Sequence, residues 1–490
     1  MIEILLENVT LIVGLILVLV YWQLPRRAKL NEPPLAYYRF PIIGHTWRYL
    51  TDCEGLILES RQKYGETFSI YIFGQLMTVV GKETSHEVLK KDKDFDFNEG
   101  TKFQLPLDYI FPHMSTTNNK TVEVVKDFAK GKLKDMLSRL QQNLTKAMDI
   151  YIGECIEPKV IHNIESVLSN IVSIPIANIV VGEECYHFGD ILETFRQLTN
   201  SIAKISFVPP ILAFIHPWLH QQFVTFGWNP IAKHRNIIIN RIRPVIEKRL
   251  KEKKELGDAW VAPLDALQVY LNDPAVAPDL DPNHVNYVLI ADSIGLIVFA
   301  AMSTTSHSAS YVLYNLAGRE EYWQELYEEA QEINKQCNEN ELTSDDIAKM
   351  VKLDSFVKES LRLAINIISL SHKCISKSHY TFENGYQIPS GRIAILNYVD
   401  TINDEGLQGH NPSEFYAYRH LERNSSATKV ERSFLTFGGG KHACPGRFLA
   451  VNEIKMIVHK IILKYHIRTE SGKVMPYRYA GANLMKDMKD

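Results

Sequence analysis

The sequence has 490 residues, of which 46% are hydrophobic and 23% charged, and these values lie close enough to globular averages to exclude a wholly disordered chain. The formal net charge of -3 gives no electrostatic reason to expect nucleic acid as a partner. The six cysteines never stand in C-x-x-C spacing, which argues against a disulfide framework or a multi-cysteine zinc site and favours a reducing compartment.

A long apolar run lies at the N-terminus, over residues 9–22. Together with the apolar residues just before it, the run approaches the ~20 residues that a helix needs to cross a bilayer. A cleaved signal peptide is the alternative, but it would have basic residues before the run, whereas here Arg26, Arg27 and Lys29 follow it. We therefore expect residues 1–24 to be a retained single-pass anchor that leaves the rest of the chain in the cytosol.

A proline-bearing stretch, residues 25–45, follows the apolar run and contains Pro33, Pro34 and Pro41. Proline fixes φ and stiffens the backbone, so we expect a semi-rigid linker, although an ordinary loop at the start of a domain is also compatible. The remaining residues, 46–490, show no internal repeat and no low-complexity tract. They are expected to form one large domain.

Two β-hairpins are predicted in this domain. The first spans residues 68–80 and turns at Gly74 and Gln75. The second spans residues 380–389 and turns at Asn384-Gly385, the strongest short-range hairpin signal.

Helical patterning dominates the chain between the two hairpins. Apolar and charged residues recur at helical spacing over residues 320–333 and 354–365. The predicted fold is therefore mainly α with small β-sheets (α+β). Two apolar stretches interrupted by proline, residues 103–112 and 207–219, are expected either to wall a pocket or to be ordinary core.

A glycine-rich segment near the C-terminus carries the chemistry. Three glycines, residues 438–440, allow positive φ and a close approach of the backbone to another group. Cys444 follows them and precedes a long helix predicted by Val451, Ile454 and Val458. Because amide N–H groups at a helix N-terminus stabilise a thiolate, and glycines leave its face open, Cys444 can ligate the iron of a haem.

Two other interpretations of this cysteine are possible. The segment could be a glycine-rich turn that holds a buried structural cysteine. A zinc site is the weaker alternative, because His442 and Cys444 supply too few ligands.

The residues around Cys444 favour the haem interpretation. Phe437, Gly438, Gly440, Cys444 and Gly446 resemble the haem-binding signature of the cytochrome P450 superfamily, and the whole chain looks most like fungal microsomal members anchored in the endoplasmic reticulum (ER). The resemblance implies a single large P450-like domain that binds haem b (iron protoporphyrin IX), with Cys444 as the ligand of the metal. His442 is counted among the cofactor-binding residues.

Other segments match the family in its order. Glu359 and Arg362 stand in its Glu-x-x-Arg helix, where residues three apart share a face and can pair. Arg419 occupies the place of the third partner in this network. The residues around Arg419 depart from the family's pattern, so only the arginine carries over.

The segment with Ser303, Thr304 and Thr305 resembles the family's oxygen-activation helix. The resemblance implies that Thr304, with Thr305 as a second candidate, relays protons to bound oxygen. Ser303 stands where the family usually has an acid. The alternative is a helix in which serine and threonine hydroxyls bond the carbonyls of their own helix.

Four basic residues are candidates for the haem propionates. His372 falls where relatives often carry an arginine, and Lys373 follows it. Lys126 and Lys130 lie in the region of the family's propionate-binding and reductase-docking helix. A simple surface pair and a solvated helix face are the respective alternatives.

The resemblance implies a haem-thiolate monooxygenase that inserts one oxygen atom of O₂ into a lipophilic substrate, for which a steroid or terpenoid is expected. Electrons are expected from NADPH through NADPH-cytochrome P450 reductase, with cytochrome b5 as a further candidate donor, because the chain has no Gly-x-Gly-x-x-Gly fingerprint. Two alternatives stay open. One is a haem-thiolate isomerase or dehydratase that acts on a peroxide without a reductase, and the other is a haem-based lipid or gas binder without turnover.

Overall fold

The computed structural model describes residues 30–102, 105–114, 118–128, 132–207, 212, 217–227, 229–337 and 341–485. The expected anchor, residues 1–24, lies outside the described residues, and so do Lys130 and most of the apolar stretch 207–219.

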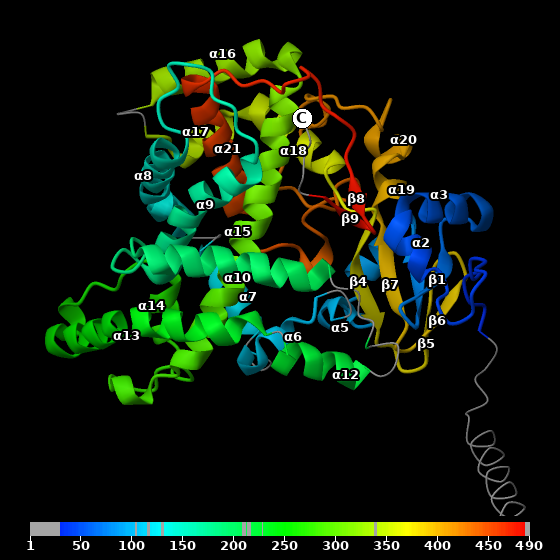
Figure 1. The fold of residues 1–490 in the computed structure, drawn as a ribbon, viewed down its shortest axis with the longest axis horizontal. Coiled ribbons are helices and arrows are strands. Elements are labelled where there is room, and N and C mark those ends of the chain that lie inside the picture. Colours follow the sequence, from blue (N-terminus) through cyan, green and yellow to red (C-terminus); the bar gives the residue numbers. More distant parts are fainter. Residues whose placement is uncertain are drawn as a thin grey trace, which may run out of the picture.

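Helices fill one side of the molecule and small sheets lie at the other, as Figure 1 shows. The fold class predicted from the sequence, mainly α with small β-sheets, is confirmed. The described α-helices are α2 (Thr46–Thr51), α3 (Cys53–Tyr64), α4 (Ser85–Lys90), α5 (Phe97–Thr101), α6 (Leu107–Ile110), α7 (Asn118–Asp127), α8 (Leu133–Tyr151), α9 (Ile164–Val181), α10 (Gly189–Phe207), α12 (Pro217–Gln222), α13 (Pro230–Leu256), α14 (Ala266–Leu271), α15 (Tyr287–Ala317), α16 (Trp323–Gln336), α17 (Ser344–Lys349), α18 (Val351–Leu363), α19 (Tyr398–Ile402), α20 (Glu405–Gln408) and α21 (Arg447–Lys464).

The largest sheet has five strands in the order β1-β2-β7-β4-β3. Strands β2 and β7 are parallel, and the other neighbours in this sheet are antiparallel. Two further sheets are the pairs β5-β6 and β8-β9. The described strands are β1 (Phe68–Ile72), β2 (Gln75–Val80), β3 (Phe95–Asp96), β4 (Ile368–Cys374), β5 (His379–Thr381), β6 (Gln387–Pro389), β7 (Ile393–Asn397), β8 (Tyr479–Ala480) and β9 (Asn483–Leu484).

Both predicted hairpins are confirmed, as β1-β2 and β5-β6. In the first, Ile72 pairs with Gln75, so the turn is Phe73-Gly74 and not Gly74-Gln75. Both turn residues have positive φ (47° and 75°), as the twist of a two-residue hairpin requires. The prediction was one residue late because a phenylalanine rarely adopts this conformation.

Helix α15 runs through the middle of the helical part, with α9 packed along it and α10 and α13 lying across it (Figure 1). It begins where the side chain of Asn286 accepts a hydrogen bond from the amide of Leu289 (3.1 Å), which satisfies one free N–H of the first turn. Helices α9 and α15 are long and apolar enough to cross a membrane, but most of their residues are buried in the core. Their apolar composition therefore serves packing.

The end of the proline-bearing segment pairs with the first strand. Pro34 O accepts from the amide of Ser69, Ala36 N donates to Ser69 O, and His45 N donates to Tyr71 O (2.8, 2.8 and 2.7 Å). Packed structure therefore begins before residue 46, as early as Asn31, whose carbonyl accepts from the amide of Gln387 (2.8 Å).

Candidate active site

The segment from Phe437 to Cys444 folds back on itself before α21. Cys444 N donates to Phe437 O (2.8 Å), and Gly438 and Gly440 have φ of +68° and +59°. A Cβ on Gly440 would lie 1.9 Å from Leu89 O, in α4. A side chain at Gly440 is therefore excluded both by backbone conformation and by the close approach of α4.

Cys444 is a free, partly exposed cysteine three residues before the first residue of α21, as predicted. Burial raises the pKa of its thiol, while hydrogen bonds from the amides of Gly446 and Arg447 and the charge of Arg447 act in the opposite direction. Arg447 Nη1 also donates to Cys444 O (2.9 Å), which ties the cysteine backbone to the start of the helix.

The predicted pair of Glu359 and Arg362 is formed and fully buried on α18. Arg362 donates through Nε and Nη2 to the two carboxylate oxygens of Glu359 (2.8 and 2.9 Å). Arg419 Nε donates to Glu359 Oε1 (3.1 Å), so the third predicted partner is in place. Burial alone would raise the pKa of Glu359, but hydrogen bonds from Arg362 and His420 outweigh it and hold this pKa well below its usual range.

His420 joins this cluster, although no motif in the sequence predicts it. Its Nε2 lies 3.1 Å from Glu359 Oε2, and the side chain is 2% exposed. Burial lowers the pKa of His420, and the hydrogen bond with Glu359 raises it. Its position next to Arg419 was the one signal in the sequence that could have indicated this role.

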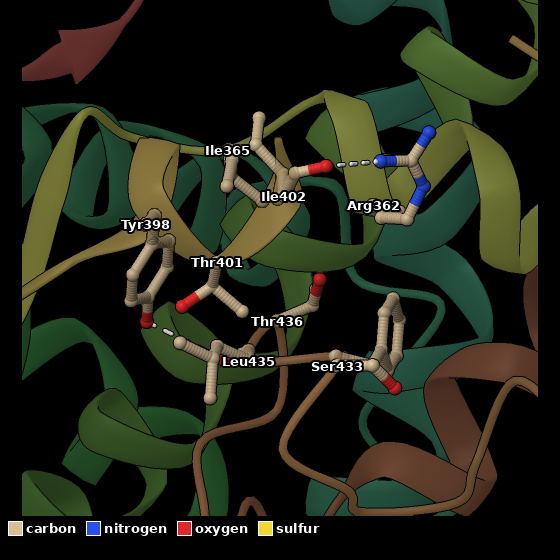
Figure 2. A pocket seen from close by; sticks show the side chains of 9 residues that line it. Arg362, Ile365, Tyr398, Thr401, Ile402, Ser433, Leu435 and Thr436 are labelled. Carbon is tan, nitrogen blue, oxygen red and sulfur yellow. Dashed lines mark hydrogen bonds between the residues drawn. The ribbon is translucent and has the colours of Figure 1, made fainter. Parts of the chain in front are cut away.

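A small cavity separates this cluster from the chain that leads into the cysteine segment, as Figure 2 shows. On one side Arg362 Nη1 donates to Ile402 O (3.0 Å). On the other, Tyr398 Oη donates to Leu435 O (3.3 Å), and Thr436 Oγ1 donates to Leu361 O, on α18 (3.1 Å). These bonds connect the buried ion cluster to the residues that immediately precede the glycines.

The predicted oxygen-activation segment lies in the middle of α15. Ala300 and Thr304 are exposed and Ser303 is partly exposed, although most of this helix is buried. Thr304 Oγ1 donates to Ala300 O (2.6 Å), so this hydroxyl bonds a carbonyl of its own helix, as the alternative interpretation of the segment expects. Thr305 is buried, 3% exposed, and so lies on a different face.

The basic candidates divide between two sides of β4. The ring of His372 lies 5.2 Å from Phe97, which in turn lies 5.6 Å from the ring of His442. Burial lowers the pKa of His372 to about 4. Lys373 instead approaches Glu99 (3.4 Å).

Helix α7 lies beside the cysteine segment. Val125 Cγ1 would be 3.8 Å from a Cβ on Gly446. Burial lowers the pKa of His442, and the nearby charges of Lys441 and Lys126 lower it further against the opposing charge of Asp96. Lys126 is therefore on the side of the cysteine segment, while Lys130 lies outside the described residues.

These features fit a bound haem. A cysteine sulfur is a known haem-iron ligand, and Cys444 is accessible and preceded by glycines. In the described part of the chain no side chain covers Ala300 or Thr304, although the rest of α15 is packed. A large flat group bounded by an uncovered helix face needs such space. The imidazole of His442 offers a donor to its carboxylates. Nδ1 of His372 instead donates to Leu370 O (2.7 Å), and because burial keeps that ring neutral its Nε2 can only accept.

Comparison with known proteins agrees with this geometry. A sequence model described as Cytochrome P450 matches residues 33–487. The chain is 28% identical to cytochrome P450 monooxygenase 110 of Postia placenta over 463 residues, which covers 89% of this chain and 87% of the relative. It is 24% identical to a cytochrome P450 monooxygenase of Ganoderma lucidum over 470 residues, with 88% and 85% covered.

These relatives are fungal, as the resemblance implied, and both are named as monooxygenases. The match spans the cysteine segment, the Glu359 cluster and α15 together. The chain therefore belongs to the cytochrome P450 family and is a haem-dependent monooxygenase.

Proposed function

We propose that this protein is an ER-anchored monooxygenase that hydroxylates a lipophilic substrate, a steroid or terpenoid, with electrons from NADPH-cytochrome P450 reductase. The observation that carries the proposal is that Cys444, in a glycine-shaped segment before α21, is only partly covered, and that α15, which packs against α21, has an uncovered face at Thr304. Cytochrome b5 is a further candidate donor, and the absence of a dinucleotide fingerprint in the sequence supports a separate reductase.

Cys444 would hold haem b through its sulfur, and the haem would supply the activation of dioxygen. Gly438 and Gly440 let the segment approach without side chains in the way. His442 would donate to the propionates from beside Phe97, whereas the neutral ring of His372 donates its one N–H to Leu370 O. Lys373 is the weaker candidate because Glu99 already partners it.

Thr304 would relay protons from water. Because its hydroxyl donates to Ala300 O, its oxygen can still accept a hydrogen bond from water. Ser303 cannot store a proton as a carboxylate does, so protons must reach Thr304 by another route. Thr305, which is buried, would act at most by supporting the helix.

Exposed apolar side chains support a membrane location and a lipophilic substrate. Tyr37, Ile42 and Trp47, near the start of the described chain, are 78%, 79% and 72% exposed, and Phe226 is 81% exposed. Phe40 and Ile43 in the same short segment are exposed as well, and a cluster of exposed apolar side chains is typical of contact with a membrane or another protein. A substrate that enters from the bilayer is consistent with them.

A haem-thiolate isomerase or dehydratase is the second candidate, and Ser303 in place of the acid is the observation that favours it. Purified holoenzyme titrated with a panel of steroids and terpenes should give a binding difference spectrum. The member with the largest response should be hydroxylated when NADPH and reductase are added. Rearrangement of a hydroperoxide without NADPH consumption would instead establish the isomerase.

A further inference from the structure

The turn of α15 that follows Thr304 carries a histidine that faces an acidic side chain of another helix. His307 lies three residues after Thr304 and four after Ser303, and residues at these spacings share one face of a helix. Its Nδ1 lies 3.9 Å from Glu165 Oε2, in the first turn of α9. The two side chains are 25% and 14% exposed, so they lie inside the protein without being sealed from water.

The sequence of α15 offers few groups that could carry a proton. Its only acidic, basic or imidazole side chains are Asp292 and His307. Asp292 is fully buried, pairs with Arg235 through both carboxylate oxygens (2.6 and 3.0 Å), and lies about three turns before Thr304. His307 lies within one turn of Thr304, and imidazole is the side chain that gains and loses a proton most readily near pH 7.

The imidazole packs against an aromatic side chain. Its Nδ1 is buried and has no hydrogen-bond partner among the described residues, so the exposed part of the ring is elsewhere. The ring of Tyr311 stands edge-on to it at 4.9 Å, and Tyr477 packs against Tyr311 at 5.0 Å. Among the described residues, the carboxylate of Glu165 from α9 and the phenol of Tyr311 therefore lie next to the imidazole, with Tyr477 behind Tyr311.

We propose that His307, paired electrostatically with Glu165, supplies protons through water to the hydroxyl of Thr304. The pair thereby takes the place of the carboxylate that Ser303 lacks. This inference rests on the proposed relay through Thr304. His307 and Glu165 are positioning residues in this scheme, because they act through Thr304.

The proton balance of the scheme closes. Each turnover takes up two electrons from the redox partner and two protons from solvent, as one oxygen atom of O₂ enters the substrate and the other leaves as water. Protonated His307 gives its proton to a water molecule hydrogen-bonded to Thr304 and then takes another from solvent. Glu165 stabilises the positive charge of the imidazole between these transfers.

The test measures product formed and hydrogen peroxide released per NADPH consumed, with holoenzyme, reductase and the panel member that binds best. His307→Gln should lower the product ratio about tenfold, with the difference recovered as peroxide, because water bypasses a missing relay group only in part. Glu165→Gln should lower the product ratio less, because His307 itself is kept. Ser308→Ala, one residue further along the same helix, is the control and should behave as wild type.

The pH profile separates proton supply from a structural role. The product ratio of wild type should depend on pH because the relay passes through a titratable side chain, whereas the low ratio of His307→Gln should not change with pH. All variants should keep the wild-type carbon monoxide spectrum. A low ratio in His307→Gln that retains the wild-type pH dependence would overturn the proposal.

A second measurement does not depend on turnover. Hydrogen exchange at the imidazole C2 position, followed by mass spectrometry in the full-length protein, should be faster at His307 than at His372 and His459, which are each 2% exposed. This measurement needs no variant. Equally slow exchange at all three histidines would therefore contradict the proposal even if His307→Gln did not fold. Full coupling in His307→Gln with poor coupling in Thr304→Ala would overturn this inference alone, and full coupling in both would overturn the proposed relay as well.

Discussion

The proposed chemistry depends on a single hydroxyl, that of Thr304. This side chain lies on the uncovered face of α15, where water can reach it. Thr304→Ala should keep the haem and the carbon monoxide spectrum, since no ligand of the iron is lost. It should slow the proton-transfer step ~10²–10⁴-fold and divert NADPH oxidation into hydrogen peroxide. The ratio of product to NADPH, compared with Ser303→Ala, measures this, and a fully coupled Thr304→Ala would show that the hydroxyl is only structural.

Glu453, on α21, gives a prediction for stability. It is fully buried, neither carboxylate oxygen has a partner among the described residues, and burial raises its pKa to about 8. In the unfolded chain the same group ionises near pH ~4.3. Its contribution to stability is therefore fully present below that pH and is lost as the pH rises through about 8.

Glu453→Gln should remove this pH dependence. Above pH 8 the variant should be more stable than wild type by about 2–5 kcal/mol, since each pKa unit corresponds to ~1.36 kcal/mol. Unfolding midpoints in urea at pH 5, 7 and 9 measure the effect, with Glu470→Gln, an exposed site, as the control. Parallel curves for wild type and Glu453→Gln would contradict it.

At the scale of elements, the Glu359 cluster joins α18 to the segment that carries Arg419 and His420. Glu359→Gln removes the charge that three basic side chains share, and breaking a buried ion pair costs about 3–5 kcal/mol. We expect a sharp fall in haem bound per polypeptide, because the same helix accepts the bond from Thr436 beside the cysteine segment.

Haem content after purification, compared with Glu328→Gln on the exposed face of α16, checks this prediction. A Glu359→Gln protein with full haem content and an unchanged unfolding midpoint would show that the cluster is dispensable.

The sequence predicted those elements and pairs that depend on residues close together in the chain. The Asn384-Gly385 hairpin, the Glu359–Arg362 pair and the helix after Cys444 follow from neighbouring residues and are all formed. The parallel pairing of β2 with β7 joins segments more than 300 residues apart, for which no local pattern exists. His420 was missed for the same reason, because its burial against Glu359 is a product of tertiary packing.

For the whole molecule, the proposed anchor places the catalytic domain in the cytosol, and the sequon at Asn424 tests this topology. Asn424 is exposed in the structure, so a lumenal domain would be open to glycosylation there. We expect no glycan at Asn424 in protein isolated from ER membranes, and no mobility shift after endoglycosidase treatment. A glycan at this position would place the domain in the lumen and contradict the topology.

The central claim is that Cys444 binds the haem iron as a thiolate, and the carbon monoxide difference spectrum of the reduced protein tests it most directly. Thiolate ligation donates electron density to the iron, so wild type should show the red-shifted Soret band of this ligand set. Cys444→Ser should lose that band, whereas Cys374→Ser, at a buried cysteine on β4, should keep it wherever the protein folds. A wild-type spectrum typical of histidine-ligated haem would contradict the account.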